Sequence, residues 1–211
     1  MKWLSRILIV VGIGFLIAFG YTIYDHANST SVTLEEAQVA LEESRAQAAE
    51  AGDGDQDGQD GASDIDIQNY QPEAGEAFGV LDIPKLDRSI GIVAGTDADS
   101  LKKGVGHVEN TVFPGQGEQI VLSGHRDTVF RDFGELEIGD NFIVQMPYGD
   151  YEYEIQDYEI VDRDDTSVIR PMGEEDLEVS TCYPFEFYGF APDRFVFYCY
   201  PCLLYTSPSP R

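Results

Sequence analysis

From residue 78 to residue 200 the chain is a series of short apolar runs separated by Gly, Pro and Asp. This pattern of apolar runs and turn residues constrains the fold more than any other feature of the sequence. Polar and apolar residues alternate from Tyr151 to Ile155, the period of a strand with one solvated face. One short helix is expected at 97–102, with Asp97 as its N-cap. The predicted strands are residues 78–83, 90–94, 119–125, 141–146, 151–161, 177–182 and 194–200. Seven or eight short strands with few helices predict an all-β sandwich or barrel.

The N-terminus carries an uncharged apolar stretch, residues 7–24, which follows Lys2 and Arg6 and precedes Asp25. A membrane-spanning helix needs about 17–25 such residues. Basic residues before the stretch place the N-terminus in the cytoplasm and the rest of the chain outside. We therefore expect residues 1–31 to form a cytoplasmic tip and a single-pass anchor in the cell membrane. The alternative is a signal peptide cleaved near Gly20.

Residues 32–77 are strongly acidic and are expected to form a stalk or linker, partly disordered. Thr33 and Glu36 fit a capping box at the start of a helix that reaches residue 51. The formal net charge of the whole chain is -26, which argues against nucleic acid as a partner.

Part of this linker has the spacing of a calcium-binding loop. Asp53, Asp55 and Asp57 alternate, Gly58 falls at the sixth position and Asp64 at the twelfth. However, no convincing helix follows. The two readings are a weak calcium-responsive spacer and a plain solvated linker, and we favour the linker.

Three residues at the edges of predicted strands suggest a catalytic site. Cys182 ends the run 177–182, His125 ends 119–125 and Arg194 opens 194–200. A neighbouring imidazole can stabilise a thiolate, protonate a leaving amine and later deprotonate an incoming nucleophile. A guanidinium can hold the oxyanion that forms when a thiolate attacks a carbonyl. This chemistry requires no metal or organic cofactor.

Each of these assignments has a competitor. A cysteine at the end of a strand can be a buried structural residue. His107, in a Gly-rich loop, is the alternative base or helps to shape the site. Asp127 and Thr181 are expected to support the site, the first near His125 and the second beside the oxyanion. Arginines that compete with Arg194 for the oxyanion are Arg126, Arg131 and Arg170.

Six short sequence motifs resemble those of a known family. They are Gly104-Val105-Gly106-His107, Leu122-Ser123-Gly124-His125-Arg126-Asp127-Thr128, Gly134-Glu135-Leu136, Pro147-Tyr148-Gly149, Thr181-Cys182-Tyr183-Pro184-Phe185 and Ala191-Pro192-Asp193-Arg194-Phe195. In this order they resemble the sortase family, and within it the class D type. The family motif reads Thr-Leu-x-Thr-Cys. Here Thr181 and Cys182 match, whereas Glu178 replaces the usual Thr and Val179 the usual Leu.

The resemblance implies an eight-stranded sortase-type β-barrel at residues 78–201, with short helices and an N-terminal membrane anchor. It implies a cysteine transpeptidase that acts outside the membrane on exported proteins with a C-terminal Leu-Pro-x-Thr sorting signal. Cys182 would form a thioester, His125 would transfer protons and Arg194 would stabilise the charged intermediate. An amine of cell-wall peptide or of a pilin lysine would accept the protein. Residues 202–211 look unlike the domain and are similar to translated sequencing-adapter sequence, so no function is assigned to them.

Two other classes of function remain open. One is a hydrolytic cysteine peptidase on the same fold, which would differ in failing to incorporate an added amine. The other is a catalytically silent, surface-tethered binding module whose acidic stalk binds cations. A thiol-reactive probe that labels Cys182 selectively would exclude the silent module.

Overall fold

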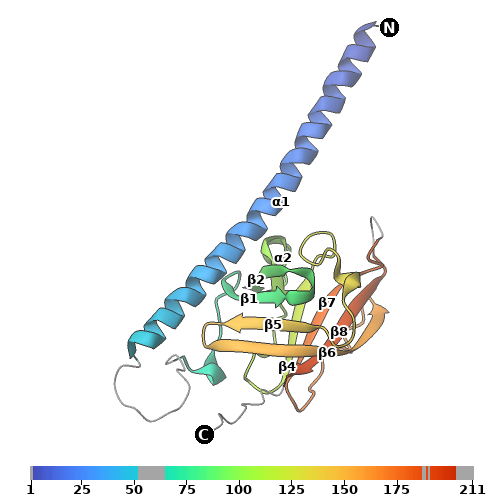
Figure 1. Ribbon diagram of the computed structural model, residues 1–211. Helices are drawn as coiled ribbons and strands as arrows, with labels where there is room; N and C mark the ends of the chain where they lie inside the picture. The colour runs from blue at the N-terminus through green and yellow to red at the C-terminus, as the bar shows by residue number, and fades with distance from the viewer. Residues whose placement is uncertain (1, 52–64, 187–188, 190, 203–211) are drawn as a thin grey trace.

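The computed structural model of the protein describes residues 2–51, 65–186, 189 and 191–202 (Figure 1). Eight strands form a closed barrel in the order β1-β2-β3-β4-β7-β8-β6-β5, which confirms the predicted all-β barrel. The strands are β1 (Ala77–Ile83), β2 (Arg88–Ala94), β3 (Val105–His107), β4 (Gln119–Gly124), β5 (Asn141–Met146), β6 (Gly149–Asp162), β7 (Asp176–Tyr183) and β8 (Asp193–Pro201). The N-terminal helix α1 (Lys2–Ala51) and the short helix α2 (Ala98–Lys103) lie outside the barrel.

The third strand, β3, was not among the predicted strands, because its sequence reads as a Gly-rich loop. It pairs parallel to β2 and antiparallel to β4. Its glycines permit this arrangement. A Cβ atom on Gly104 would lie 2.2 Å from the carbonyl oxygen of Gly91, and one on Gly106 would lie 2.5 Å from that of Gly95. The assignment of His107 to a loop is therefore wrong: His107 ends a short, fully buried strand.

The barrel interior is filled largely by aromatic and branched aliphatic side chains. Phe133 contacts the rings of Phe130, Phe142 and Phe197, and Tyr153 is fully buried. Burial of each such side chain contributes about 1.5–3 kcal/mol to folding. The closed core gives the strands a fixed register, and that register positions the residues at their ends.

The helix α2 begins as predicted. The Asp97 carboxylate accepts hydrogen bonds from the backbone nitrogens of Asp99 and Ser100, at 2.9 and 3.2 Å, and from the Ser100 hydroxyl at 2.6 Å. These bonds lower the pKa of Asp97, because they stabilise its charged form. The cap therefore fixes the start of the crossover between β2 and β3.

The helix α1 is continuous over 50 residues, so the prediction that a separate helix begins at Thr33 is wrong. No Gly or Pro occurs between residues 21 and 51 to interrupt it. Polar residues that favour caps are accommodated because their hydroxyls bond back to the preceding turn. The Thr33 hydroxyl donates to the Ser29 carbonyl at 2.9 Å, and Ser31 to Asn28 at 2.9 Å.

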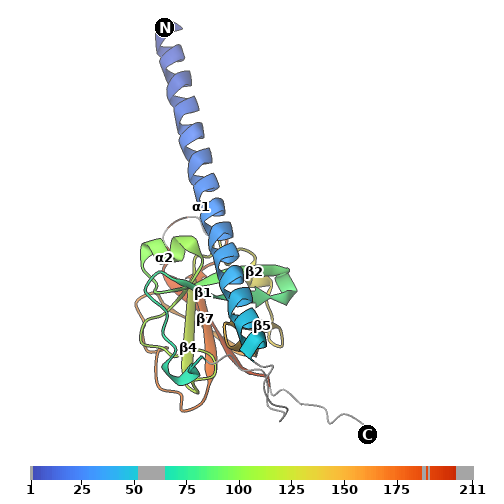
Figure 2. The same cartoon turned by 90° about the vertical axis from the view of Figure 1, so that its left-hand side faces the viewer.

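The second half of α1 packs on the outside of the barrel, beside β1 and β2 (Figure 2). Thr33, Ala37 and Leu41 form one helical stripe and are 2%, 0% and 3% exposed, with Ala37 and Leu41 against Val80 of β1. Ion pairs flank this contact: Lys102 with Asp25, and Arg45 with Asp150. Residues 33–41 thus belong to the folded unit.

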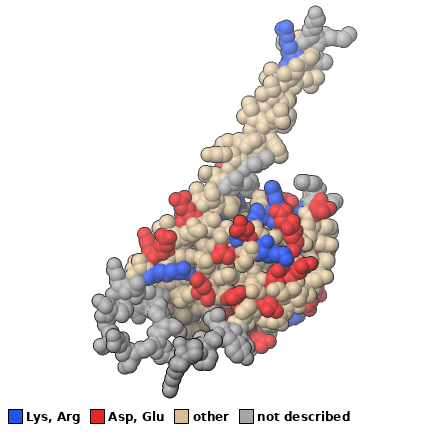
Figure 3. Space-filling view, in the orientation of Figure 1, with Lys and Arg blue, Asp and Glu red and all other residues tan. Residues whose placement is uncertain are grey.

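The first half of α1 leaves the barrel. Its window Ser5–Thr22 has a mean hydropathy of 1.8, and none of it is buried, so it is long and apolar enough to cross a membrane. Figure 3 shows this part of the helix almost entirely without charged side chains, whereas acidic and basic residues mix over the barrel face. The candidate calcium residues Asp53, Asp55, Asp57 and Asp64 lie outside the described residues.

Candidate active site

Cys182 lies on β7, half-buried, directly opposite Arg194 of β8 in the antiparallel register. The Arg194 Nη1 donates to the Cys182 Sγ at 3.3 Å. Because a guanidinium is permanently charged, Arg194 places a fixed cation at the sulfur. Of the competing arginines, Arg131 bonds the carbonyl of Asp127 at 3.1 Å. Only Arg194, among the described arginines, has a hydrogen bond to this thiol.

His125 follows β4 immediately and is exposed. β4 runs parallel to β7, with Gly124 opposite Thr181. Continuing that register by one residue places His125 beside Cys182. The His125 carbonyl accepts from the backbone nitrogens of Thr128 and Phe130, at 3.4 and 3.1 Å, which fixes the turn. The structure thus brings all three predicted residues to one edge of the barrel, from the adjacent strands β4, β7 and β8.

Two features hold the end of β4 against β7. The Thr181 side chain points inward, 1% exposed, and its hydroxyl donates to the Gly124 carbonyl at 2.8 Å. A Cβ atom on Gly124 would lie 2.6 Å from the Phe130 ring, so the turn needs glycine there. Thr181 therefore acts on the strand that leads into His125, from the barrel side opposite to Cys182.

Arg126 was predicted only as a competitor for the oxyanion, and its role in joining two segments of the site was not predicted. It is 5% exposed, and its Nη1 and Nη2 donate to the carbonyls of Pro184 and Gly189, at 2.6 and 3.2 Å. It thereby ties the segment after His125 to the segment after Cys182. Its place directly after His125 in the phrase Ser123-Gly124-His125-Arg126-Asp127 was the available signal.

The remaining supporting candidates lie in different surroundings. Asp127 is exposed and pairs with Arg126, at 3.3 Å from its Nε. His107 is 4% exposed and stacks on Phe113 with ring centroids 4.2 Å apart. Its Nε2 lies 2.9 Å from the Val112 carbonyl, and burial lowers its pKa, which favours the neutral ring. The described contacts of His107 are therefore those of a core residue.

The three thiols differ in their surroundings. All are free, and Cys199 is fully buried. Burial raises the pKa of Cys199 well above its ordinary value, and raises that of Cys202 as well. Within residues 2–51, 65–186, 189 and 191–202, no group of three or more His, Cys, Asp or Glu side chains is arranged to hold a metal ion.

Two hollows are lined by site residues or by their neighbours in the chain. One, of about 150 Å³, extends from Arg194 and Ser180 along β7 to Glu178, beneath the β6–β7 loop. The other, of about 1060 Å³, lies between the segments after β4 and β7, and its lining includes Arg126 and Tyr183.

Comparison with known proteins agrees with this geometry. Residues 81–202 match the Sortase domain family. Sortase D of Bacillus subtilis (strain 168) is 43% identical over 194 residues, covering 90% of this chain and 94% of that protein. The chain belongs to the sortase family. This sortase is of the class D type, and sortases are cysteine transpeptidases, so it is an enzyme.

Solved structures extend the likeness. The catalytic domain of B. anthracis SrtD is 40% identical, with a TM-score of 0.53, covering 65% of this chain and 97% of that one. The Clostridium perfringens Sortase D5 transpeptidase has a TM-score of 0.64 and covers 83% of this sortase and 99% of that chain. At 22% identity, it supports the fold alone.

Proposed function

We propose that this sortase is held in the cell membrane by residues 1–31 and cleaves a Leu-Pro-x-Thr sorting signal on an exported protein. The catalytic domain, residues 78–201, works outside the membrane. The observation that supports this most directly is the 3.3 Å contact of Arg194 with Cys182 beside the end of β4. The apolar, unburied helix window Ser5–Thr22 supports the anchor.

In the first half-reaction, the Cys182 thiolate attacks the Thr carbonyl carbon of the signal. A carbon–sulfur bond forms and the carbonyl oxygen becomes an oxyanion, which Arg194 stabilises. The oxyanion then collapses, and the carbon–nitrogen bond of the peptide breaks. His125 donates its proton to the departing amine. The product is a thioester between the exported protein and Cys182.

In the second half-reaction, an amine of cell-wall peptide or of a lysine on another protein attacks the thioester. His125 accepts a proton from that amine, and the Cys182 thiolate leaves. The lining of the larger hollow has more acidic than basic side chains, so an ammonium group would find favourable charge there. The acids are Asp127, Asp132, Glu135 and Glu186, and the bases are Arg126 and Arg131. Water in place of the amine would give hydrolysis, the competing activity.

The test uses the full chain in detergent and quenched fluorescent peptides that contain Leu-Pro-x-Thr, with and without an added amine. We expect cleavage that requires Cys182 and yields an amine-linked product by mass spectrometry. The matched control is Cys182→Ala. Turnover by that variant would overturn the nucleophile assignment, and cleavage without amine incorporation would establish a hydrolase instead.

A second measurement addresses the catalytically silent binding module. Iodoacetamide should alkylate Cys182 fastest, because Cys199 is fully buried and burial raises the pKa of Cys202. Mass spectrometry of the alkylated tryptic peptides would give the three rates. If Cys182 reacted no faster than Cys199 in the folded protein, the site would be inert and the silent module would be favoured.

A further inference from the structure

The outer face of β7 carries a line of polar residues that leads away from the catalytic thiol. Because side chains alternate across a strand, Asp176, Glu178, Ser180 and Cys182 share one face. The hollow of about 150 Å³ follows this line, and we call it the β7 trough. Its floor is formed by Ser180 and Glu178, its walls include Val121 of β4 and Val196 of β8, and residues of the loop 163–169 cover it.

Glu178 lies at the end of the β7 trough farthest from Cys182 and is 0% exposed. Its Oε1 accepts a hydrogen bond from Nε2 of Gln119 at 2.6 Å. Its Oε2 has no partner within the described part of the chain. An unpaired buried polar atom costs about 1–3 kcal/mol. Both carboxylate oxygens of Asp176 are unpaired as well, but of these two residues only Glu178 lines the β7 trough, so a ligand in the trough would supply a partner to Glu178.

The neighbouring amide fixes which oxygen is available. The Gln119 Nε2 also donates to the Val168 carbonyl at 2.9 Å, while its Oε1 accepts from the backbone nitrogen of Arg170 at 2.9 Å. The amide is therefore held in one orientation, with its NH₂ group toward Glu178. Since Gln119 donates to Oε1, a proton on the Glu178 carboxyl belongs on Oε2, the oxygen without a partner.

We propose that Glu178 is a specificity-determining residue, whose Oε2–H donates a hydrogen bond to a backbone carbonyl of the sorting peptide upstream of the cleaved bond. This inference rests on the proposed function. Glu178 lies four positions before Cys182 along β7, about 13 Å at 3.3 Å per residue. An extended peptide with its Thr carbonyl at Cys182 therefore reaches Glu178 at the first residue of the signal or the one before it.

The charges around Glu178 favour its neutral form. Burial raises its pKa most, and Asp176 on β7 and Glu159 on β6 raise it further, whereas Gln119 on β4 and Arg170 in the β6–β7 loop lower it. The result is a pKa of about 8. On β8, the Tyr198 hydroxyl donates to Glu159 at 3.1 Å. A donor at neutral pH thus becomes an anion in alkaline solution, and the bond to a carbonyl is lost.

The test measures binding separately from catalysis. Isothermal titration calorimetry would use the full chain with Cys182→Ala in detergent, and the octapeptide Gly-Gly-Leu-Pro-Ala-Thr-Gly-Gly. We expect the peptide Kd to rise about tenfold from pH 6 to pH 9.5, since a tenfold change corresponds to about 1.4 kcal/mol, the size of one hydrogen bond. Glu178→Thr, the residue of the family motif, should bind about tenfold more weakly at pH 6.

Two further variants separate a direct contact from a structural role. Glu178→Gln keeps an N–H donor and should bind at pH 6 within about twofold of the parent, with its Kd unchanged to pH 9.5. Asp176→Asn removes one cause of the raised pKa, so the pH at which binding weakens should move down. Thermal unfolding of each variant at pH 6 would verify that it is folded.

Each outcome bears on the proposal. Equal peptide affinity for Glu178→Thr and the parent, or a pH dependence that persists in Glu178→Gln, would overturn it. So would a peptide that does not bind. Cleavage assays on the same variants with Cys182 restored distinguish failure of this inference from failure of the proposed catalysis. If the enzyme cleaves the peptide but substitutions at Glu178 do not change the peptide Kd, only the inference about Glu178 is wrong. If the peptide Kd depends on Glu178 but no cleavage occurs, only the proposed catalysis is wrong.

Discussion

The two ends of the outer face of β7 differ in whether their surroundings favour a charged or a neutral side chain. At one end Cys182 is half-buried, in contact with the permanent cation of Arg194, and near the larger hollow. At the other end Asp176 and Glu178 are fully buried, and the pKa values of these carboxyls rise to about 6 and about 8. One strand therefore presents a reactive group and a neutral acid on a single face. The difference arises from burial and neighbours, since the backbone conformation is the same.

After loss of the nucleophile itself, the largest expected effect comes from removing the cation at the reactive end. Arg194→Ala should lower kcat/KM by about 10²–10³-fold, the usual effect of losing one oxyanion donor. Arg194→Lys should fail to restore the rate, because an ammonium lacks the planar fork of the guanidinium. Steady-state kinetics with the cleaved peptide would measure both. A near-native rate for Arg194→Ala would transfer the role to another arginine.

A smaller effect is expected from the inward face of β7. Thr181→Val removes the hydroxyl that bonds the Gly124 carbonyl and keeps nearly the same shape. Loss of one buried hydrogen bond costs about 1–3 kcal/mol. We expect kcat to fall about tenfold with KM nearly unchanged, because His125 loses its fixed position. A matched control is Thr33→Val on α1, which removes a buried hydroxyl that bonds the Ser29 carbonyl at 2.9 Å and should leave kcat and KM unchanged. A rise in KM without loss of kcat for Thr181→Val would contradict the assignment.

The smallest effect concerns stability at the neutral end. Glu178 keeps its proton in the folded state to about pH 8, whereas its ordinary pKa is 4.5. The unfolded chain therefore loses this proton first, and the free energy of unfolding falls as pH rises from about 5 to 8. Glu178→Gln removes this loss. Its Tm should equal that of the parent near pH 5 and exceed it by at least about 2–4 °C at pH 8. Equal values at both pH values would show that Glu178 is not buried as described.

The strands and the catalytic edge were predictable because their signals are local. Alternation marked β6, and Cys182, His125 and Arg194 each stood at the edge of an apolar run. The third strand was not predictable from propensity, because Gly104 and Gly106 serve a close approach of backbones that only the folded barrel creates.

Burial of charged side chains was equally hidden. Acidic and basic residues are mostly exposed in folded proteins, so nothing in the sequence marked Glu178 or Arg126 as buried. Only their neighbours in space explain them: Gln119 for Glu178, and the carbonyls of Pro184 and Gly189 for Arg126. The continuity of α1 was missed for a related reason, since Thr33 reads as a cap when considered alone.

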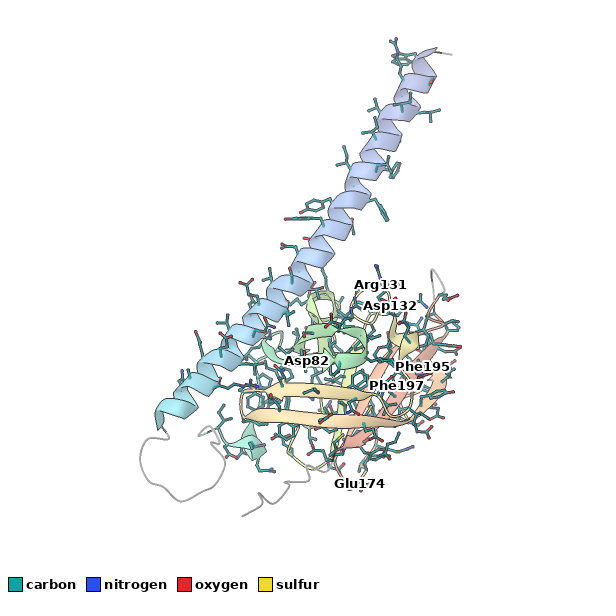
Figure 4. All side chains as sticks on the ribbon, in the orientation of Figure 1. Asp82, Arg131, Asp132, Glu174, Phe195 and Phe197 are labelled. Carbon is teal, nitrogen blue, oxygen red and sulfur yellow. The ribbon has the colours of Figure 1, made fainter. Side chains whose placement is uncertain are left out.

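The unbroken helix α1 sets a standoff distance. Thr33, which packs on the barrel, lies eleven positions after Thr22, the end of the apolar window, a distance of about 16 Å along the helix at 1.5 Å per residue. In Figure 4, Arg131 and Asp132 lie at the barrel edge nearest the apolar half of α1, and Glu174 at the opposite edge. If that half lay in a bilayer, the edge that carries Arg131 and Asp132, in the segment after His125, would face the lipid. Position above the membrane then becomes a second criterion of selection, beside the sequence of the signal.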